Sequence, residues 1–187
     1  VILAAGKSTR FKGNNSKIFQ DLGGIKIIQH VYNLAKKISG KDIVIVCNNE
    51  NINDLKKIFN NCKFVIQKQQ KGTADAVLCA KPFLKKTNFL VLFGDAPLIS
   101  IISIRKLINN FKNNNSDGSM MSFKASNPYS YGRVITEGKK VIKVVEQINL
   151  IKEEQNLNLC NAGVILAKTK LFFKNLSKIK INNIKKE

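Results

Sequence analysis

The sequence has 187 residues, of which 44% are hydrophobic, and four cysteines. This length suits a single domain with a real core, and no apolar run approaches the roughly 20 residues that a bilayer span requires. We expect no signal peptide, because charged residues begin at Lys7. The cysteines are widely spaced without a CxxC pair, which excludes a disulfide frame or a zinc site and predicts free thiols in a reducing, cytoplasmic setting.

The formal net charge is +20, from 32 Lys and Arg against 12 Asp and Glu. Only three of these cations are Arg, whereas recognition of bases and phosphates by fork geometry relies on Arg. The lysines are also spread along the chain rather than gathered into one stripe. We therefore interpret the charge as a solvated surface that attracts anionic ligands in general, and we expect neither nucleic acid nor a membrane as partner.

Apolar runs and helical periodicities alternate through the first half of the chain. They predict strands over 1–5, 42–47, 64–67 and 88–93, and helices over 27–38, 51–59, 73–85 and 103–113. This alternation is typical of a parallel sheet covered by helices on both faces. The second half has shorter connections and predicts strands over 118–124, 133–136, 139–147 and 159–167, with a hairpin turn at Glu137-Gly138.

A polar loop over 6–17 follows the first strand, where ligands of open parallel sheets bind. Gly6-Lys7-Ser8 matches the end of a P-loop, but Val1 stands where the first glycine of that motif belongs. The dinucleotide fingerprint also fails, because the next glycine after Gly6 is Gly13. A third kind of loop remains, in which small residues let backbone amides approach a nucleotide and two cations, Arg10 and Lys17, face its triphosphate.

The motifs along nearly the whole chain carry a resemblance. "LAAGKSTRF…SK", "VIQKQQKGTADAV", "LFGDAPLI", "NPYSYGRVI", "VVEQ" and "CNAGVILA" occur in this order. The chain resembles the nucleotidyltransferase domain of N-acetylglucosamine-1-phosphate uridylyltransferases, the N-terminal half of bifunctional GlmU proteins, within the MobA-like NTP transferase superfamily. The resemblance implies an α/β fold, Rossmann-like with three α/β/α layers and a mainly parallel central sheet. We expect one nucleotidyltransferase domain over 1–187, truncated at both ends and with its C-terminal part incomplete.

The reaction that the resemblance implies transfers a uridylyl group from UTP to N-acetylglucosamine 1-phosphate, for cell-wall precursor synthesis. Its two reactants are anionic, so positive groups and a metal should supply most of the catalysis. The catalytic candidates are Arg10, Lys17 and Asp95. Asp95 follows an apolar strand and Gly94, and its oxygens suit Mg²⁺, which makes it the expected metal ligand. The only histidine, His30, lies on a helical pattern, and we interpret it as structural.

The resemblance also implies the substrate contacts. Uridine would contact the backbone of Leu3, Ala4, Ala5 and Gly6, together with Gln67, Gly72 and Thr73. Gly132 would let a backbone amide approach the sugar, and Glu146 and Asn161 would hydrogen-bond its hydroxyl or acetamido groups. The chain departs from the family pattern at Ala162, where Thr is usual, and at Phe93, where Tyr is commoner. It also lacks the usual Pro before Lys17, which leaves the placement of that lysine less rigid.

The family's second metal ligand, an Asn, would lie beyond Glu187, so we expect this piece to bind UTP weakly and to turn over poorly. Two alternatives stay open. One is another sugar- or alcohol-phosphate nucleotidyltransferase, of cytidylyl, thymidylyl or molybdenum-cofactor type, against which Gln67 and Tyr131-Gly132-Arg133 argue. The other is a non-catalytic basic binding module. The sequence leaves open a homotrimeric parent protein and an acetyltransferase half.

Overall fold

The structure is a computed structural model that describes residues 1–6, 16–69 and 71–176. Within these ranges an eight-stranded sheet has the order β5-β4-β1-β6-β10-β8-β9, with β7 paired to β10. Its strands are β1 (Ile2–Leu3), β4 (Val44–Cys47), β5 (Lys63–Ile66), β6 (Asn88–Phe93), β7 (Gly118–Lys124), β8 (Arg133–Glu137), β9 (Lys140–Val145) and β10 (Leu159–Lys168). A separate hairpin pairs β2 (Asp21–Leu22) with β3 (Ile25–Lys26).

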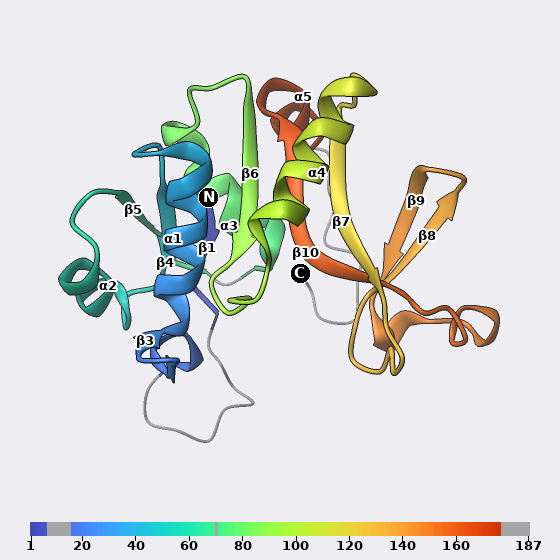
Figure 1. Ribbon diagram of the computed structural model, residues 1–187, viewed down its shortest axis with the longest axis horizontal. Coiled ribbons are helices and arrows are strands. Elements are labelled where there is room, and N and C mark those ends of the chain that lie inside the picture. Colours follow the sequence, from blue (N-terminus) through green and yellow to red (C-terminus); the bar gives the residue numbers. More distant parts are fainter. Residues whose placement is uncertain (7–15, 70, 177–187) are drawn as a thin grey trace.

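The sheet is parallel in one half and antiparallel in the other. β1 lies between β4 and β6, and β4 pairs with β5, all in parallel. β10 is antiparallel to β6, β7 and β8, and β8 forms a hairpin with β9. Figure 1 shows the parallel half under α1 and the β8–β9 hairpin projecting at the far end. The predicted α/β class is confirmed, and the sheet is mixed because β8, β9 and β10 follow β7 without an intervening α-helix.

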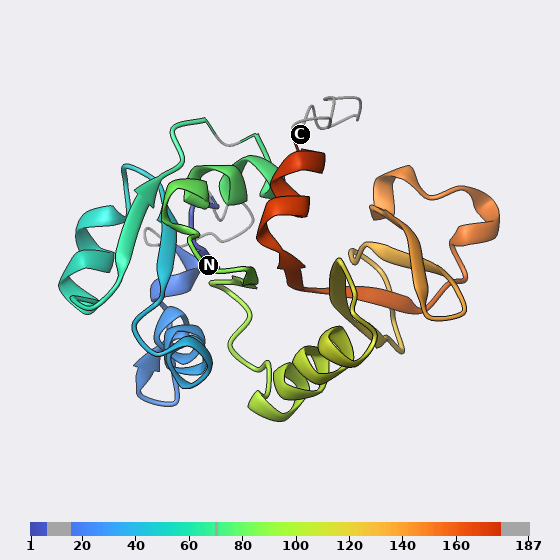
Figure 2. The same ribbon diagram turned by 90° about the horizontal axis from the view of Figure 1, so that it is seen from above.

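Helices cover both faces of the sheet, as the alternation of strands and helices predicted. They are α1 (Ile27–Ser39), α2 (Ile52–Ile58), α3 (Thr73–Ala80), α4 (Ile101–Asn113) and α5 (Thr169–Leu176). Figure 2 shows α1 and α4 on one side of the sheet and α3 and α5 on the other. Short 3₁₀ helices connect the elements: η1 (Lys17–Phe19), η2 (Lys81–Phe83), η3 (Gln147–Asn149) and η4 (Lys152–Glu154).

Successive residues of the central strands pack into two separate hydrophobic clusters, one on each face of the sheet. Ile2, Ile45 and Leu92 pack with α1, α2 and α4, whereas their neighbours Leu3, Val46 and Val91 pack with α3 and α5. A strand turns successive side chains to opposite faces, so these apolar runs bury both faces of the parallel half. The three-layer arrangement leaves the carboxyl ends of β1, β4, β5 and β6 together at one edge.

Several boundaries differ from the predicted ones. The helix expected over 73–85 ends at Ala80, and Lys81–Phe83 continues as a 3₁₀ turn, since Pro82 lacks a backbone N–H and restricts the residue before it. The fourth helix begins at Ile101 rather than 103, because the Ser100 hydroxyl caps it by accepting from the Ser103 N–H at 3.0 Å. The sequence did not predict the β2–β3 hairpin or α5.

Candidate active site

The first loop leaves β1 through Ala4 and Ala5, which are both buried, and reaches the surface at Gly6. The Ala4 N–H donates to the Val46 carbonyl at 2.7 Å, and the Gly94 N–H donates to the Leu3 carbonyl at 2.8 Å. The neighbouring parallel strands therefore fix the backbone at the point where this loop starts. Arg10, which we predicted to face the triphosphate, lies outside the described residues.

Two buried asparagines hold the same backbone from the side. Asn51 Nδ2 donates to the Ala4 carbonyl at 2.7 Å, and Asn48 Nδ2 donates to the Ala5 carbonyl at 3.1 Å. Each asparagine also accepts a backbone N–H of the other through its side-chain oxygen. The sequence did not predict this pair. Its signal was a polar residue directly after the apolar strand 44–47, at the carboxyl end where loops need buried hydrogen-bond partners.

Gln67 follows β5, and the structure brings it to the start of α3. It is 5% exposed, and its Nε2 donates to the Gly72 carbonyl at 3.2 Å and to Asp75 Oδ2 at 2.7 Å. Gly72 is the N-cap of α3 with φ +97°, a conformation that favours glycine, and Thr73 is the first helical residue. Gln67, Gly72 and Thr73, three of the residues predicted to contact uridine, thus form one group.

Lys17 and Asp95 approach each other although 78 residues separate them in the chain. Lys17 Nζ lies 3.4 Å from Asp95 Oδ2, and both side chains are about half exposed, at 48% and 49%. Gly94 sets Asp95 close to the first loop: a Cβ there would lie 3.0 Å from the Leu3 carbonyl and 2.8 Å from Ile28 Cδ1. The pair therefore stands at the carboxyl ends of β1 and β6 and is open to solvent.

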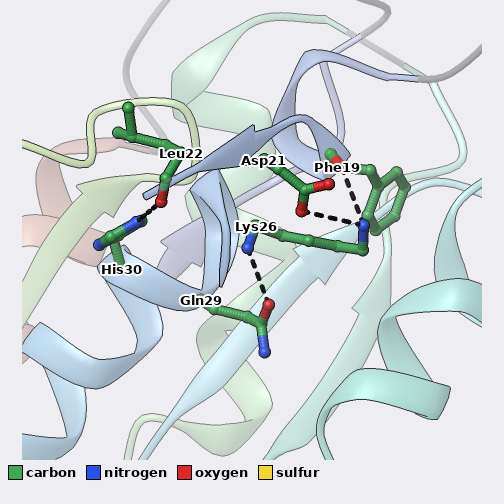
Figure 3. Close-up of polar contacts among 6 residues, drawn as sticks. All are labelled: Phe19, Asp21, Leu22, Lys26, Gln29 and His30. Carbon is green, nitrogen blue, oxygen red and sulfur yellow. Dashed lines mark hydrogen bonds and ion pairs between the residues drawn. The ribbon is translucent and has the colours of Figure 1, made fainter. Parts of the chain in front are cut away.

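The β2–β3 hairpin anchors the segment that carries Lys17. Lys26 Nζ donates to the Phe19 carbonyl at 3.2 Å and pairs with Asp21 at 3.5 Å, while the Lys26 N–H donates to Gln29 Oε1 at 2.9 Å (Figure 3). His30 Nε2 lies 2.7 Å from the Leu22 carbonyl and must donate, because a carbonyl only accepts (Figure 3). These contacts tie the residues after Lys17 to the first turns of α1, and they give His30 a structural contact.

The predicted sugar residues form a second group, on the antiparallel half. The Asn161 N–H donates to the Gly132 carbonyl at 2.9 Å, and a Cβ on Gly132 would lie 3.3 Å from Glu146 Oε1. Asn161 Oδ1 accepts the Gly163 N–H at 2.8 Å, which orients the side-chain amide. The β10–β7 register shifts between Asn161 and Ile165, so the start of β10 bends at these residues.

Arg133 is a buried cation that hydrogen-bonds to residues of this second group's segments. It is 2% exposed, and its guanidinium donates to the Leu157 carbonyl at 2.9 Å, to Gln147 Oε1 at 2.7 Å and to the Tyr131 carbonyl. Tyr131 precedes Gly132 and Gln147 follows Glu146 in the chain, so one buried cation connects the two segments that carry this group. We predicted no separate role for Arg133 from its motif.

The two groups meet at Phe93 and Gly163. β10 runs antiparallel to β6 with Ile165 opposite Val91, and Phe93, the last residue of β6, lies against Gly163. A Cβ on Gly163 would lie 2.2 Å from Phe93 Cδ2, so the ring rests directly on this glycine. In the sheet order β5-β4-β1-β6-β10, the Lys17–Asp95 pair, at the end of β6, therefore lies between the group around Gln67, after β5, and the group around Asn161, in β10.

The chemistry available here is that of cations, carboxylates and amides. Burial raises the pKa of Cys47 and of Cys62 to about 11, so both remain protonated thiols at neutral pH. All four cysteines are free, as predicted. Among residues 1–6, 16–69 and 71–176, no cluster of three His, Cys, Asp or Glu side chains could hold a metal ion. Over the same ranges, no helix combines the length and apolar character needed to cross a membrane.

Comparison with known proteins gives concordant results. A family model described as the MobA-like NTP transferase domain matches residues 1–155. The chain is 42% identical over 189 residues to the bifunctional protein GlmU of Buchnera aphidicola subsp. Schizaphis graminum, and 34% identical over 190 residues to that of Francisella tularensis subsp. novicida. All of this chain is covered in both matches, but only 41% of each relative, so the chain spans about two fifths of their length.

Solved structures of nucleotidyltransferases share the fold. A putative glucose-1-phosphate thymidylyltransferase from Bacillus anthracis has a TM-score of 0.79 at 20% identity, covering 96% of this chain and 78% of that one. A CMP:2-keto-3-deoxy-manno-octonic acid synthetase complexed with CTP has a TM-score of 0.74 at 16% identity, covering 98% and 78%. At these identities the likeness concerns the fold.

Proposed function

The chain belongs to the MobA-like NTP transferase family, and from that premise we propose that it transfers the uridylyl group of UTP to N-acetylglucosamine 1-phosphate. The products are UDP-N-acetylglucosamine and pyrophosphate. The observation that carries the proposal is the position of the Lys17–Asp95 pair, 3.4 Å apart, between the group around Gln67 and the group around Asn161. The similarity to GlmU proteins over the whole chain supports the choice of substrates.

In the proposed reaction a phosphate oxygen of the sugar phosphate attacks the α-phosphorus of UTP. One P–O bond forms, the bond from the α-phosphorus to the bridging oxygen breaks, and pyrophosphate leaves with its electron pair. Both reactants are anions, so repulsion and alignment dominate the barrier. The ammonium of Lys17 offsets phosphate charge, and we assign the same role to Arg10 from the sequence. No covalent intermediate on the protein is required.

Asp95 is the residue that we propose to hold Mg²⁺. Its carboxylate is half exposed at the carboxyl end of β6, and Mg²⁺ is commonly bound through one or two carboxylates with substrate phosphates and water. The donor set therefore fits the ion. When bound, Mg²⁺ would neutralise phosphate charge beside the reacting centre. Lys17 and Asp95 can then exchange their mutual contact for phosphate and cation, since both are open to solvent.

The test is pyrophosphate release by the full-length protein with a panel of triphosphates and sugar phosphates. We expect UTP with N-acetylglucosamine 1-phosphate to be the best pair, and a rate with CTP or GTP equal to that with UTP would refute the uridylyl assignment. Asp95→Ala and Lys17→Ala should each lower kcat/KM by about 100-fold or more, as removal of an electrostatic group from a transition state does. Near-normal rates for either variant would contradict its assigned role.

A further inference from the structure

The side-chain amide of Gln67 is held in one orientation by Asp75. Both N–H groups of Nε2 are used inside the protein, one by the Gly72 carbonyl at 3.2 Å and one by Asp75 Oδ2 at 2.7 Å. A backbone carbonyl and an ionised carboxylate only accept hydrogen bonds. Rotating the amide by half a turn would place Oε1 against two acceptors, so hydrogen-bond chemistry fixes Nε2 as the atom that faces them.

This orientation leaves Oε1 as the polar side-chain atom of Gln67 that can meet a ligand. No hydrogen bond to Oε1 comes from the described part of the chain. Every fully buried side-chain N or O in the same part has a partner, so Oε1 must reach the surface although the residue is only 5% exposed. Gln67 thus offers a ligand the acceptor Oε1, whereas both N–H groups of Nε2 are already bonded within the protein.

An acceptor in this place discriminates between pyrimidines. Uracil carries a donor, N3–H, at the centre of its pairing edge, whereas cytosine carries an unprotonated N3 that only accepts. An acceptor aimed at that position gains a hydrogen bond with uracil and faces a second acceptor with cytosine. A site built to hydrogen-bond a substrate group rejects the analogue that lacks it, because buried polar atoms are then unpaired.

We propose that Asp75 is a specificity-determining positioning residue, which fixes the Gln67 amide so that Oε1 selects a base with N3–H over cytosine. The inference rests on the proposed function, since it assumes that the base of UTP lies at Gln67. Asp75 itself need not touch the nucleotide. The plainer role for an acidic residue in the first turn of α3 is to stabilise the helix N-terminus, and that role predicts no change in base preference.

The main experiment compares kcat/KM for UTP and CTP in the wild-type full-length protein and in the Asp75→Ala variant. With the carboxylate removed, the amide can rotate, and the UTP-over-CTP ratio should fall about tenfold, as loss of one hydrogen bond to a charged group does. Asp75→Glu keeps a carboxylate and should retain most of the preference. Asp54→Ala removes a first-turn carboxylate from α2, where it pairs with Lys57 at 2.9 Å, and should leave the ratio unchanged.

Equal losses with both nucleotides in Asp75→Ala, at an unchanged ratio, would mean that Asp75 only stabilises α3 and would overturn the proposal. If Asp75→Ala does not fold, a nucleotide analogue can be used with the wild-type protein instead. The wild-type protein should discriminate against N3-methyluridine triphosphate about as strongly as against CTP, and use of this analogue like UTP would also overturn it. Dissociation constants for the same three nucleotides test the inference separately if the transfer reaction itself is not found.

Discussion

The two halves of the sheet hold their functional residues by different means. In the parallel half, buried neutral amides hold the start of the first loop, because Asn51 donates to the Ala4 carbonyl and Asn48 donates to the Ala5 carbonyl. In the antiparallel half the corresponding groups are charged: Arg133 donates to the carbonyl of Tyr131, next to Gly132, and Lys143 forms an ion pair with Glu154. The contrast follows from burial, because β4 is buried at every residue while β9 is exposed along most of its length.

This difference shows where the fold tolerates buried amides and where it tolerates charged side chains. A charge inside the parallel half would lose hydration on both faces of the sheet, whereas an amide there needs only its two or three hydrogen bonds. In the antiparallel half, Lys143 remains 53% exposed, so its ammonium keeps water while it binds Glu154. Arg133 is the exception, and three oxygen acceptors compensate its burial.

The contact between the halves should be the most sensitive point. Gly163 has φ +74°, and a Cβ there would overlap the Phe93 ring at 2.2 Å. Gly163→Ala therefore combines a left-handed backbone cost with overpacking, and we expect a loss of about 3 kcal/mol in the free energy of unfolding, measured by urea denaturation. In a Phe93→Ala background, Gly163→Ala should cost only the backbone part of this loss, because the ring that the Cβ would overlap is absent.

Gly138→Ala is the matched control for that variant. Gly138 has φ +56° in the β8–β9 turn, and a Cβ there would meet nothing within 4 Å. Only the backbone cost remains, so we expect a loss of about 1 kcal/mol. If Gly138→Ala were as destabilising as Gly163→Ala, overlap with the Phe93 ring would not explain the cost of the substitution at Gly163.

The buried amides of the parallel half give the next largest effect. Asn51→Ala removes the donor to the Ala4 carbonyl and leaves that oxygen buried, so unfolding should become about 2 kcal/mol easier. Asn114→Ala also removes an amide bonded to a carbonyl, that of Asn110 at 2.8 Å, but at an exposed position where water replaces it. A thermal melt of both variants should separate them clearly. Similar melting temperatures would show that burial does not set the value of these amides.

The sequence predicted what periodicity and motif spacing encode. The nucleotidyltransferase fold and family are confirmed, and so is the parallel half of the sheet, because apolar strands and amphipathic helices are local patterns. The β2–β3 hairpin was missed because each strand has two residues, too few for an alternation to be visible. Asn51 and Arg133 were missed because their partners are distant in the chain, and the orientation of the Gln67 amide against Asp75 is a side-chain property that no spacing in the sequence reports.

The ion pair of the antiparallel half should give the smallest effect and a pH-dependent one. The hydrogen bond from Lys143, at 2.7 Å, lowers the pKa of Glu154 below its ordinary value of 4.5. The stability that this pair contributes is therefore present above that value and is lost as the pH falls through the lower pKa of the folded state. The melting temperature of Glu154→Gln should lie slightly below that of the wild type at pH 7, and the difference should vanish toward pH 3. Glu153→Gln removes the same charge from the adjacent, exposed residue, and its melting temperature should not show this pH-dependent difference from the wild type. If the melting temperature of Glu154→Gln were lower than that of the wild type by the same amount at every pH, the effect would come from packing instead of charge.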